Sequence, residues 1–495
     1  MNAKKILTAL LALALAITPL ASCKNENGAP NAEEQTTDAP VDKTPIFIED
    51  EDTDFWKAMN AGFDKAVLGA EADFEIETAN GEVTILSYKG AEEHLRIPAT
   101  IDGLPVTAIA DGAFAVPIEG PKDENQEADQ TETQEEAKAP QRQLQTLILP
   151  ESITAIGKGI LARCESLHSL QTPLMGANKE STQYLGYLFG ATTHADNARD
   201  IPDTLKCFKL TGEWQALPAF ALFDCNDLVC LELPETLTVI EKFALFNGAS
   251  LRQIDGLERI TVFGDRALMD CAALQTVTLA DELKAVGFGT FEGCKSLRSM
   301  TLPFVGHTPE EHTYLGYLFG ASQPDFAKGF YPAELCRITL RSTCSTLGNY
   351  AFYQCETLKE ITLPEGLESI GLRAFAGCER LWSITFPGTL TTIREAAFFG
   401  CDALSSITFT EGLTTLGINT FYNCDSLTEV ILPQSLKALP ASCFAGCTAL
   451  AKIDLGGVIE VGAQAFRHCN ALAEAHAAGN VTFEKGNEKI EDILK

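Results

Sequence analysis

Basic residues are scarce in this chain of 495 residues, which has 37 Lys and Arg against 68 Asp and Glu and a formal net charge of -31. Proteins that bind nucleic acid or an anionic lipid surface concentrate positive charge, so the sequence predicts no nucleic-acid partner. Hydrophobic residues are plentiful, at 45% of the chain. This content suffices for a large buried core and excludes disorder of the whole chain.

Motifs for cofactor or metal chemistry are also missing. The chain has no C-x-x-C, G-x-S-x-G or H-E-x-x-H sequence, and its seven histidines are scattered. His307 and His312 flank Thr-Pro-Glu-Glu, but this arrangement beside Pro309 is more typical of a solvated loop than of a metal site. These absences predict a protein that is not an enzyme and that has no cofactor and no metal site.

Apolar runs long enough to span a bilayer are absent as well. The apolar stretch 6–17 follows two lysines and ends in Leu20-Ala21-Ser22-Cys23, which resembles the bacterial lipobox. The resemblance implies that residues 1–22 are a signal peptide and that Cys23 carries a lipid. We expect an exported protein anchored to a bacterial membrane, at the outer membrane or cell surface; an ordinary cleaved signal is the alternative.

The segment after the lipobox has the composition of a tether. Residues 23–54 are acidic and rich in Asn, Pro and Thr without a hydrophobic period, so we expect them to be disordered. Within 55–78, apolar residues at helical spacing predict a short helix or linker. These apolar residues are Phe55, Met59, Phe63 and Val67.

A repeat with a period of about 23 residues organises the rest of the chain. Its clearest marks are the equally spaced cysteines, each with Phe three residues before it and Leu three residues after it. These cysteines are Cys355, Cys378, Cys401, Cys424 and Cys447. Between them lie alternating apolar segments such as Ile361-Thr-Leu363-Pro364, which predict short strands with one buried face.

The repeat also extends upstream, with two longer steps of equal length, from Cys164 to Cys225 and from Cys294 to Cys355. Each step contains Tyr-Leu-Gly-Tyr-Leu-Phe-Gly-Ala, at 184–191 and again at 314–321, within inserts at about 174–206 and 304–336. We count about fourteen coils over 79–475, followed by a cap or tail at 476–495. An acidic segment at 116–143 has no core pattern, which predicts a disordered loop.

The pattern L-x-x-I-T-L-P-x-x-L-x-x-I-G-x-x-A-F-x-x-C, as at 358–378, resembles the BspA-like (Treponema pallidum type) leucine-rich repeats of bacterial surface proteins. The resemblance implies a repeat solenoid, a leucine-rich-repeat horseshoe or right-handed coil with a parallel β-sheet. It also implies a non-enzymatic binding protein that adheres to host matrix proteins or to other bacteria. An envelope scaffold or carbohydrate-binding protein without a host partner is the alternative.

Ten of the sixteen cysteines occupy one repeat position, where Gly248 also occurs. We interpret them as free thiols that face the core, although stacked coils also bring such residues close enough for disulfides. Five cysteines lie off this position and could pair or stay free. They are Cys207, Cys230, Cys336, Cys344 and Cys443.

The strand residues that point away from the core form one continuous surface, here called the strand face. Six threonines belong to it, at 278, 301, 339, 362, 385 and 408. Their simplest explanation is β-propensity and stacked hydroxyls. Trp382, in a position otherwise filled by small or polar residues, indicates a ligand contact together with Thr362, Thr385 and Thr408.

The aromatic inserts offer a second candidate site. Tyr184, Tyr187, Tyr314 and Tyr317 either cover an edge of the coil where the repeat is interrupted or form a paired platform for a protein or glycan. Covering the edge is the simpler interpretation.

Deleting Val116 to Gln143 tests the disordered-loop interpretation. We expect the melting temperature of the folded core to stay nearly unchanged, because eight acidic residues and no core pattern contribute no packing. Thermal denaturation of the deletion variant measures this, and a large drop would mean that the segment is structural.

Overall fold

The computed structural model describes residues 60–116, 143–311 and 313–494. Several predictions from the sequence lie outside these ranges. They concern the signal peptide, Cys23, the tether, Phe55 and Met59, His312 and most of the acidic segment. A short helix covers 60–65, but Val67 belongs to strand β1 because it pairs in parallel with Leu95.

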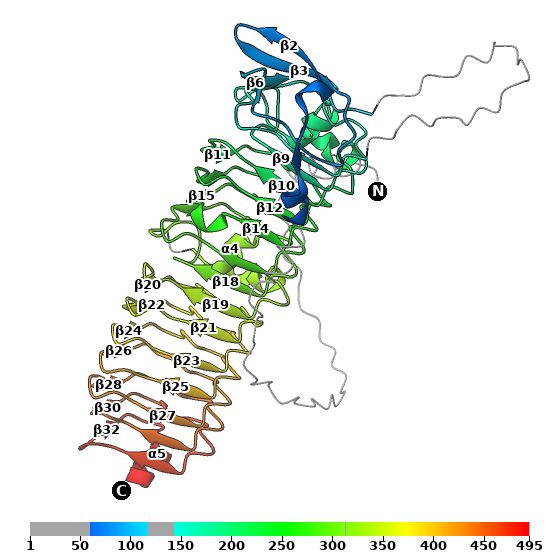
Figure 1. The fold of residues 1–495 in the computed structure, drawn as a ribbon. Coiled ribbons are helices and arrows are strands. Elements are labelled where there is room, and N and C mark those ends of the chain that lie inside the picture. Colours follow the sequence, from blue (N-terminus) through cyan, green and yellow to red (C-terminus); the bar gives the residue numbers. More distant parts are fainter. Residues whose placement is uncertain (1–59, 117–142, 312, 495) are drawn as a thin grey trace, which may run out of the picture. The chain divides into compact units, whose positions relative to one another are not determined.

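A row of short parallel strands, one per coil, runs through the described coils (Figure 1). Its sixteen strands are β1 (Val67–Leu68), β4 (His94–Arg96), β7 (Thr146–Ile148), β9 (Ser169–Thr172), β10 (Cys207–Leu210), β12 (Cys230–Glu232), β14 (Gln253–Asp255), β16 (Thr276–Thr278), β18 (Ser299–Leu302), β19 (Arg337–Leu340), β21 (Glu360–Thr362), β23 (Ser383–Thr385), β25 (Ser406–Thr408), β27 (Glu429–Ile431), β29 (Lys452–Asp454) and β31 (Glu474–His476). The repeat predicts fourteen of them. The two additional strands, β1 and β31, lie at the ends.

The strands keep one register along the row. Leu95 aligns with Leu147, which aligns with Leu170, and all three side chains are fully buried. Hydrogen bonding between strands divides the row into sheets of seven, four and five strands, β1 to β14, β16 to β21 and β23 to β31. The predicted parallel solenoid is therefore confirmed, and most strands place an aligned apolar residue in the core, whereas both residues of β1 are exposed.

A second row of shorter strands lies on the opposite side of the coils (Figure 1). Its members are β8 (Ala155–Ile156), β11 (Ala216–Leu217), β13 (Val239–Ile240), β15 (Val262–Phe263), β17 (Ala285–Val286), β20 (Thr346–Leu347), β22 (Ser369–Ile370), β24 (Thr392–Ile393), β26 (Thr415–Leu416), β28 (Ala438–Leu439), β30 (Glu460–Val461) and β32 (Thr482–Phe483). At the first coils this row meets β2 (Phe74–Ala79), β3 (Glu82–Tyr88), β5 (Thr100–Ile101) and β6 (Leu104–Ile109).

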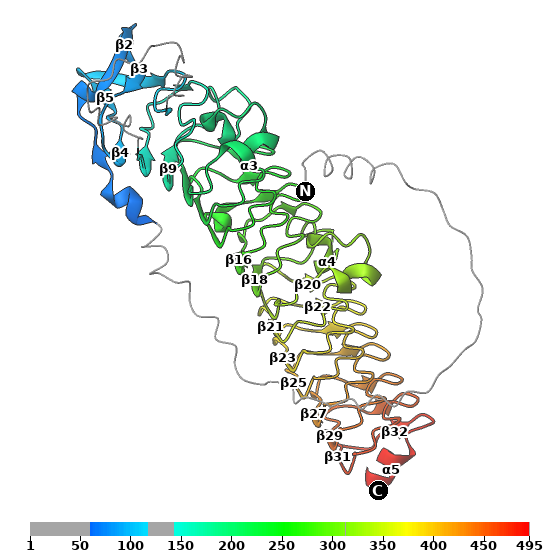
Figure 2. The ribbon, with the colours of Figure 1, turned by 90° about the vertical axis from the view of Figure 1, so that its right-hand side faces the viewer.

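Helices are few and short in the described ranges (Figure 2). Besides 60–65, they are η1 (Glu71–Asp73), η2 (Leu185–Phe189), η3 (His194–Asp196), α3 (Asn197–Asp200), η4 (Leu257–Arg259), α4 (Leu315–Leu318), η5 (Pro324–Gly329) and α5 (Glu488–Leu494). None of these described helices has the length and apolar character needed to cross a membrane.

The repeated phenylalanines form a continuous stack inside the C-terminal coils. Successive ring centroids lie 5.0, 4.9, 5.2, 5.3 and 5.9 Å apart along Phe352, Phe375, Phe398, Phe421, Phe444 and Phe466. These rings are nearly parallel and almost fully buried. Their separations match the spacing of about 4.8 Å between neighbouring strands, so one ring per coil fills the core continuously.

The repeated cysteines donate weak hydrogen bonds between coils. In each case Sγ donates to the carbonyl oxygen of the Phe one coil earlier, at 3.1 to 3.3 Å, for Cys378, Cys401, Cys424, Cys447 and Cys469. Burial raises the pKa of the thiols at 378, 401, 424 and 469, and it raises the pKa of Cys355 to about 12. The position favours cysteine because this side chain is small and its thiol can donate a hydrogen bond to a buried carbonyl.

One disulfide forms among the described residues, and it joins two cysteines off the repeat position. Cys207 and Cys230 are register partners on β10 and β12, with their Cα atoms 4.9 Å apart. Cys336, Cys344 and Cys443 are free thiols, as are the repeat-position cysteines that follow Cys164. Cys164 itself donates to the Phe114 carbonyl at 3.3 Å.

Removing one ring from the stack should destabilise the protein strongly. We expect Phe398→Ala to cost about 3–5 kcal/mol, because the cavity lies between two stacked rings. Urea denaturation measures this loss. The matched control is Phe399→Ala, whose side chain is 41% exposed and which should cost no more than about 1 kcal/mol. Equal losses of unfolding free energy in the two variants would show that the buried Phe stack stabilises the protein no more than an exposed phenylalanine does.

Candidate functional site

The predicted strand face exists as an aligned row of outward side chains. Thr339 aligns with Thr362 across β19 and β21, and Thr385 aligns with Thr408 across β23 and β25. Thr362, Thr385 and Thr408 are exposed, whereas the central residues of their strands point into the core. The strands thus present a hydroxyl-rich surface that spans several coils.

Trp382 lies immediately before β23 and is half-buried. Its backbone carbonyl accepts hydrogen bonds from the Ser405 N–H at 3.0 Å and from Ser405 Oγ at 3.2 Å. These bonds hold the tryptophan backbone against the next coil, at the edge of the strand face. A ligand contact at Trp382 stays a prediction.

Charged pairs flank the threonines along the same row. Arg337 Nη2 lies 2.8 Å from Glu360 Oε2, and toward the C-terminus Lys452 Nζ lies 3.1 Å from Glu429 Oε1. Such partly exposed pairs stabilise little and exchange readily with other partners. The strand face is therefore mainly polar, with Ile431 as an exposed apolar residue on β27.

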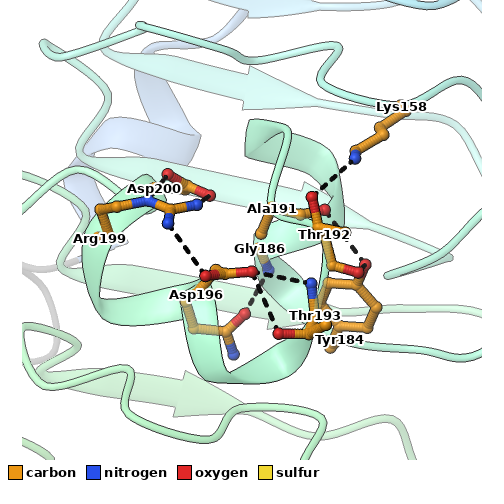
Figure 3. Close-up of polar contacts among 10 residues, drawn as sticks. Lys158, Tyr184, Gly186, Ala191, Thr192, Thr193, Asp196, Arg199 and Asp200 are labelled. Carbon is orange, nitrogen blue, oxygen red and sulfur yellow. Dashed lines mark hydrogen bonds and ion pairs between the residues drawn. The ribbon is translucent and has the colours of Figure 1, made fainter. Parts of the chain in front are cut away.

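The first aromatic insert is packed into its coil (Figure 3). Tyr184 is only 7% exposed, and its hydroxyl donates to the carbonyls of Ala191 at 3.2 Å and Thr192 at 2.9 Å. Burial raises the pKa of this tyrosine. With its ring buried and its hydroxyl satisfied, Tyr184 offers little surface to a ligand, which favours the interpretation that it covers the coil edge; a ligand contact at this residue stays a prediction.

The loop after this tyrosine is closed by its own polar groups (Figure 3). Asp196 Oδ2 accepts from the Thr193 N–H and from Thr193 Oγ1, both at 3.1 Å, while Asp196 Oδ1 lies 3.0 Å from Arg199 Nη1. Arg199 also pairs with Asp200 at 2.7 Å. These charges are used within the insert and do not converge on a cavity.

The other three tyrosines of the inserts are half-buried, and their hydroxyls also have partners within the coils. Tyr187 donates to the Ile156 carbonyl at 3.2 Å, and Tyr314 donates to the Ala321 carbonyl at 2.8 Å. The Tyr317 hydroxyl lies 3.5 Å from His307 Nδ1. The arrangement agrees with the interpretation that these residues cover the edge of the interrupted coil.

The two inserts achieve one geometry with different residues. In the first, buried Asn197 accepts from the Gly186 N–H at 3.0 Å and donates to the Phe223 carbonyl at 2.8 Å. In the second, the equivalent of Asn197 is alanine. There Tyr331, which follows four residues later, donates to the Tyr353 carbonyl at 3.0 Å, and Tyr353 is the equivalent of Phe223.

No cluster of three His, Cys, Asp or Glu side chains suited to a metal ion occurs in the described ranges. His307 uses Nδ1 to contact the Val286 carbonyl at 2.8 Å.

Sequence reasoning missed a further surface, here called the turn-side aromatic rows. Phe220 stacks on Phe243 with centroids 5.6 Å apart, and Phe223 stacks on Phe246 at 4.7 Å. His194 lies on Phe220 at 4.4 Å. All five side chains are half-buried. One sequence feature could have revealed this surface. Aromatic residues recur two and five positions before the repeat cysteine, or before Gly248 where glycine replaces it.

Two of these aromatics adopt an unusual backbone conformation. Phe220 has φ 64° and Phe243 has φ 56°, in the left-handed region where bulky residues are rare. The same left-handed conformation recurs five residues before the repeat cysteine in other coils, as at Arg266, Tyr350 and Arg373, so it belongs to the repeated turn. The stacked, half-buried rings form a second candidate surface on the turn side of the coils.

Exchanging the partners of the two inserts tests their equivalence. Asn197→Ala should cost about 2–3 kcal/mol, because it leaves a buried N–H and a buried carbonyl unpaired. Adding Ile201→Tyr, which supplies the hydroxyl used in the second insert, should recover part of this loss. Thermal denaturation and hydrogen exchange over 184–191 measure both variants. A double variant no better than the single one would contradict the equivalence.

Comparison with known proteins agrees with this architecture. The family described as "BspA type Leucine rich repeat region" matches in six copies over residues 129–185, 204–313, 327–450 and 370–487. No curated protein matches the chain.

Among solved structures, the chain is similar to a leucine-rich cell surface protein from Faecalibacterium prausnitzii. They share 19% identity over 86% of this chain and 97% of that one, with a TM-score of 0.30. A leucine-rich repeat protein from Bacteroides ovatus shares 16% identity over 83% and 98% of the two chains, with a TM-score of 0.31. The T. pallidum leucine-rich repeat protein shares 14% identity over 82% and 91%, with a TM-score of 0.19. Since the family match covers more than half of the sequence, the chain belongs to the BspA-type leucine-rich repeat family.

Proposed function

We propose that this protein is exported, anchored to a bacterial membrane through a lipid on Cys23, and displayed at the outer membrane or cell surface as a non-enzymatic binding protein. Its partner is a host matrix protein or a surface protein of another bacterium. The contact is made by the strand face around Thr362, Thr385, Thr408 and Trp382. Membership of a family of bacterial surface repeat proteins supports display and protein binding in general.

The observation that carries the proposal is the register of the strand face. Parallel strands hold the exposed threonines in line across successive coils, with Trp382 at their edge. An extended, rigid and polar surface suits a protein partner, and a partly exposed tryptophan is a common anchor in such interfaces. The formal charge of -31 favours a neutral or basic partner.

An envelope scaffold or carbohydrate-binding protein is the second candidate. The turn-side aromatic rows favour it, because the half-buried rings of Phe220 and Phe243 stack side by side. Aromatic faces accept the apolar faces of sugar rings and recur in sites for small ligands. This function needs no host protein.

A binding panel separates the two. The chain from Lys24 to Lys495, without lipid, is passed over immobilised matrix proteins, bacterial surface proteins and a glycan array at physiological salt. Saturable binding to a protein supports adhesion. Binding to glycans alone favours the carbohydrate function, and binding to neither removes the support for adhesion.

Substituting the tryptophan locates the contact. We expect Trp382→Ala to weaken protein binding by about 2 kcal/mol, or roughly 30-fold, because it removes an aromatic anchor. Unfolding free energy should change by no more than about 1 kcal/mol, since the side chain is half-buried. Surface plasmon resonance measures the affinity, with Phe399→Ala as the control for loss of an aromatic on the turn side. Unchanged affinity would exclude the strand face around Trp382.

A further inference from the structure

A groove lined by both polar and apolar surface opens at the N-terminal end of the main strand row, away from the threonines. It has a volume of about 180 Å³ and lies between the helix at 60–65 and the strands β4, β7, β9 and β10. The side chains that carry the argument are Lys65, His94, Gln145, His168, Ser169 and Lys206. Two lysines and two histidines thus meet in one groove of a strongly acidic chain.

The floor of the groove is fixed by its neighbours. His94 Nδ1 lies 2.9 Å from Thr146 Oγ1, and Thr146 is fully buried. Cys207, which also lines the groove, is tied to the next coil by its disulfide with Cys230. These contacts fix the positions of His94, Thr146 and Cys207. Other polar atoms of the groove remain able to bind a ligand.

A glycine allows the helix to form the groove wall. A Cβ atom on Gly62 would lie 2.8 Å from Ser169 Oγ and 2.9 Å from Thr146 Oγ1. The helix backbone therefore lies directly against the floor hydroxyls, which brings Lys65 to the same groove.

The donors outnumber the carboxylates that face them. Lys206 Nζ lies 3.3 Å from Asp227 Oδ1, but both side chains are more than a third exposed, so this pair is weak. Gln145 Nε2 donates to Glu93 Oε2 at 2.9 Å. Lys65 pairs with no carboxylate among the described residues. The ammonium group of Lys65, and that of Lys206 when its weak pair opens, can therefore bind an added anion.

A histidine adds to the polar groups of the groove. His168 Nδ1 contacts the Ser166 carbonyl at 2.7 Å, and because a carbonyl only accepts, Nδ1 must carry hydrogen. In the neutral ring the second nitrogen is then an acceptor, which suits a sugar hydroxyl. Amines, a ring nitrogen, an amide and a hydroxyl in one groove match an oxyanion surrounded by hydroxyl groups.

We propose that this groove binds an acidic sugar unit, with its carboxylate or sulfate group between Lys65 and Lys206. The volume is comparable to that of a cavity of about 150 Å³ that holds one benzene ring, so the groove suits one sugar ring but not a folded partner. Ser169 and Gln145 supply hydrogen bonds for the sugar hydroxyls. The site is separate from the protein contact proposed for the strand face.

Calorimetric titration of the chain from Lys24 with glucuronate, acetate, sulfate and glucose at pH 6 tests the proposal. We expect glucuronate to bind at least about tenfold more tightly than glucose, because only glucuronate carries charge. Glucuronate should also bind more tightly than acetate. Equal binding of acetate and glucuronate would overturn the sugar assignment, and equal binding of glucose would overturn the anion site.

Variants locate the binding. Lys65→Gln combined with Lys206→Gln should weaken glucuronate binding at least about tenfold. The control is Lys284→Gln, an exposed lysine before β17 and outside the groove lining, which should leave binding within about twofold. His168→Ala should weaken binding without loss of the folded state. Wild-type affinity in the double variant, or no binding of glucuronate by the wild type at millimolar concentration, would overturn the proposal while leaving protein binding by the strand face untouched.

Discussion

Contact between one coil and the next is the interaction on which this structure depends. A single coil has no core of its own, because its apolar side chains are covered only when neighbouring coils stack on both sides. Here that contact has two parts that recur at the same step. Phe rings stack at about 5 Å, and the cysteine thiols of the C-terminal coils donate to a carbonyl of the previous coil. Both require every coil to keep the same backbone path.

This constraint explains which features the sequence predicts. Positions that face a neighbouring coil repeat, so the strand centres, the Phe stack and the cysteine position are all visible as a period. The strand face follows from the same alternation, since residues next to a buried strand centre must point outward. Thr385 and Thr408 accordingly align in the structure.

Other features do not recur with the repeat, so the periodic sequence pattern does not predict them. Strands β1 and β31 lie at the ends, where one face of the coil has no identical neighbour to impose the pattern. The disulfide between Cys207 and Cys230 forms because these residues are register partners on neighbouring strands. The spacing of the cysteines in the sequence does not by itself single out this pair. The stacked rings of Phe220 and Phe243 fall at a turn position whose left-handed backbone recurs in other coils but whose side chain varies. The groove at the N-terminal end of the main strand row draws its side chains from a helix and four coils, and no local motif unites them.

The exchange of Asn197 for Tyr331 has a consequence for how such a gene can recombine. The two inserts share the sequence found at 184–191 and 314–321, and they are alike enough to misalign during copying. A crossover between the asparagine position and the tyrosine position would give one product with both bridging side chains and one with neither. The first is crowded and the second leaves a buried N–H and carbonyl unpaired. A crossover inside this short window is therefore disfavoured, whereas a crossover elsewhere in the inserts leaves one bridging side chain in each product.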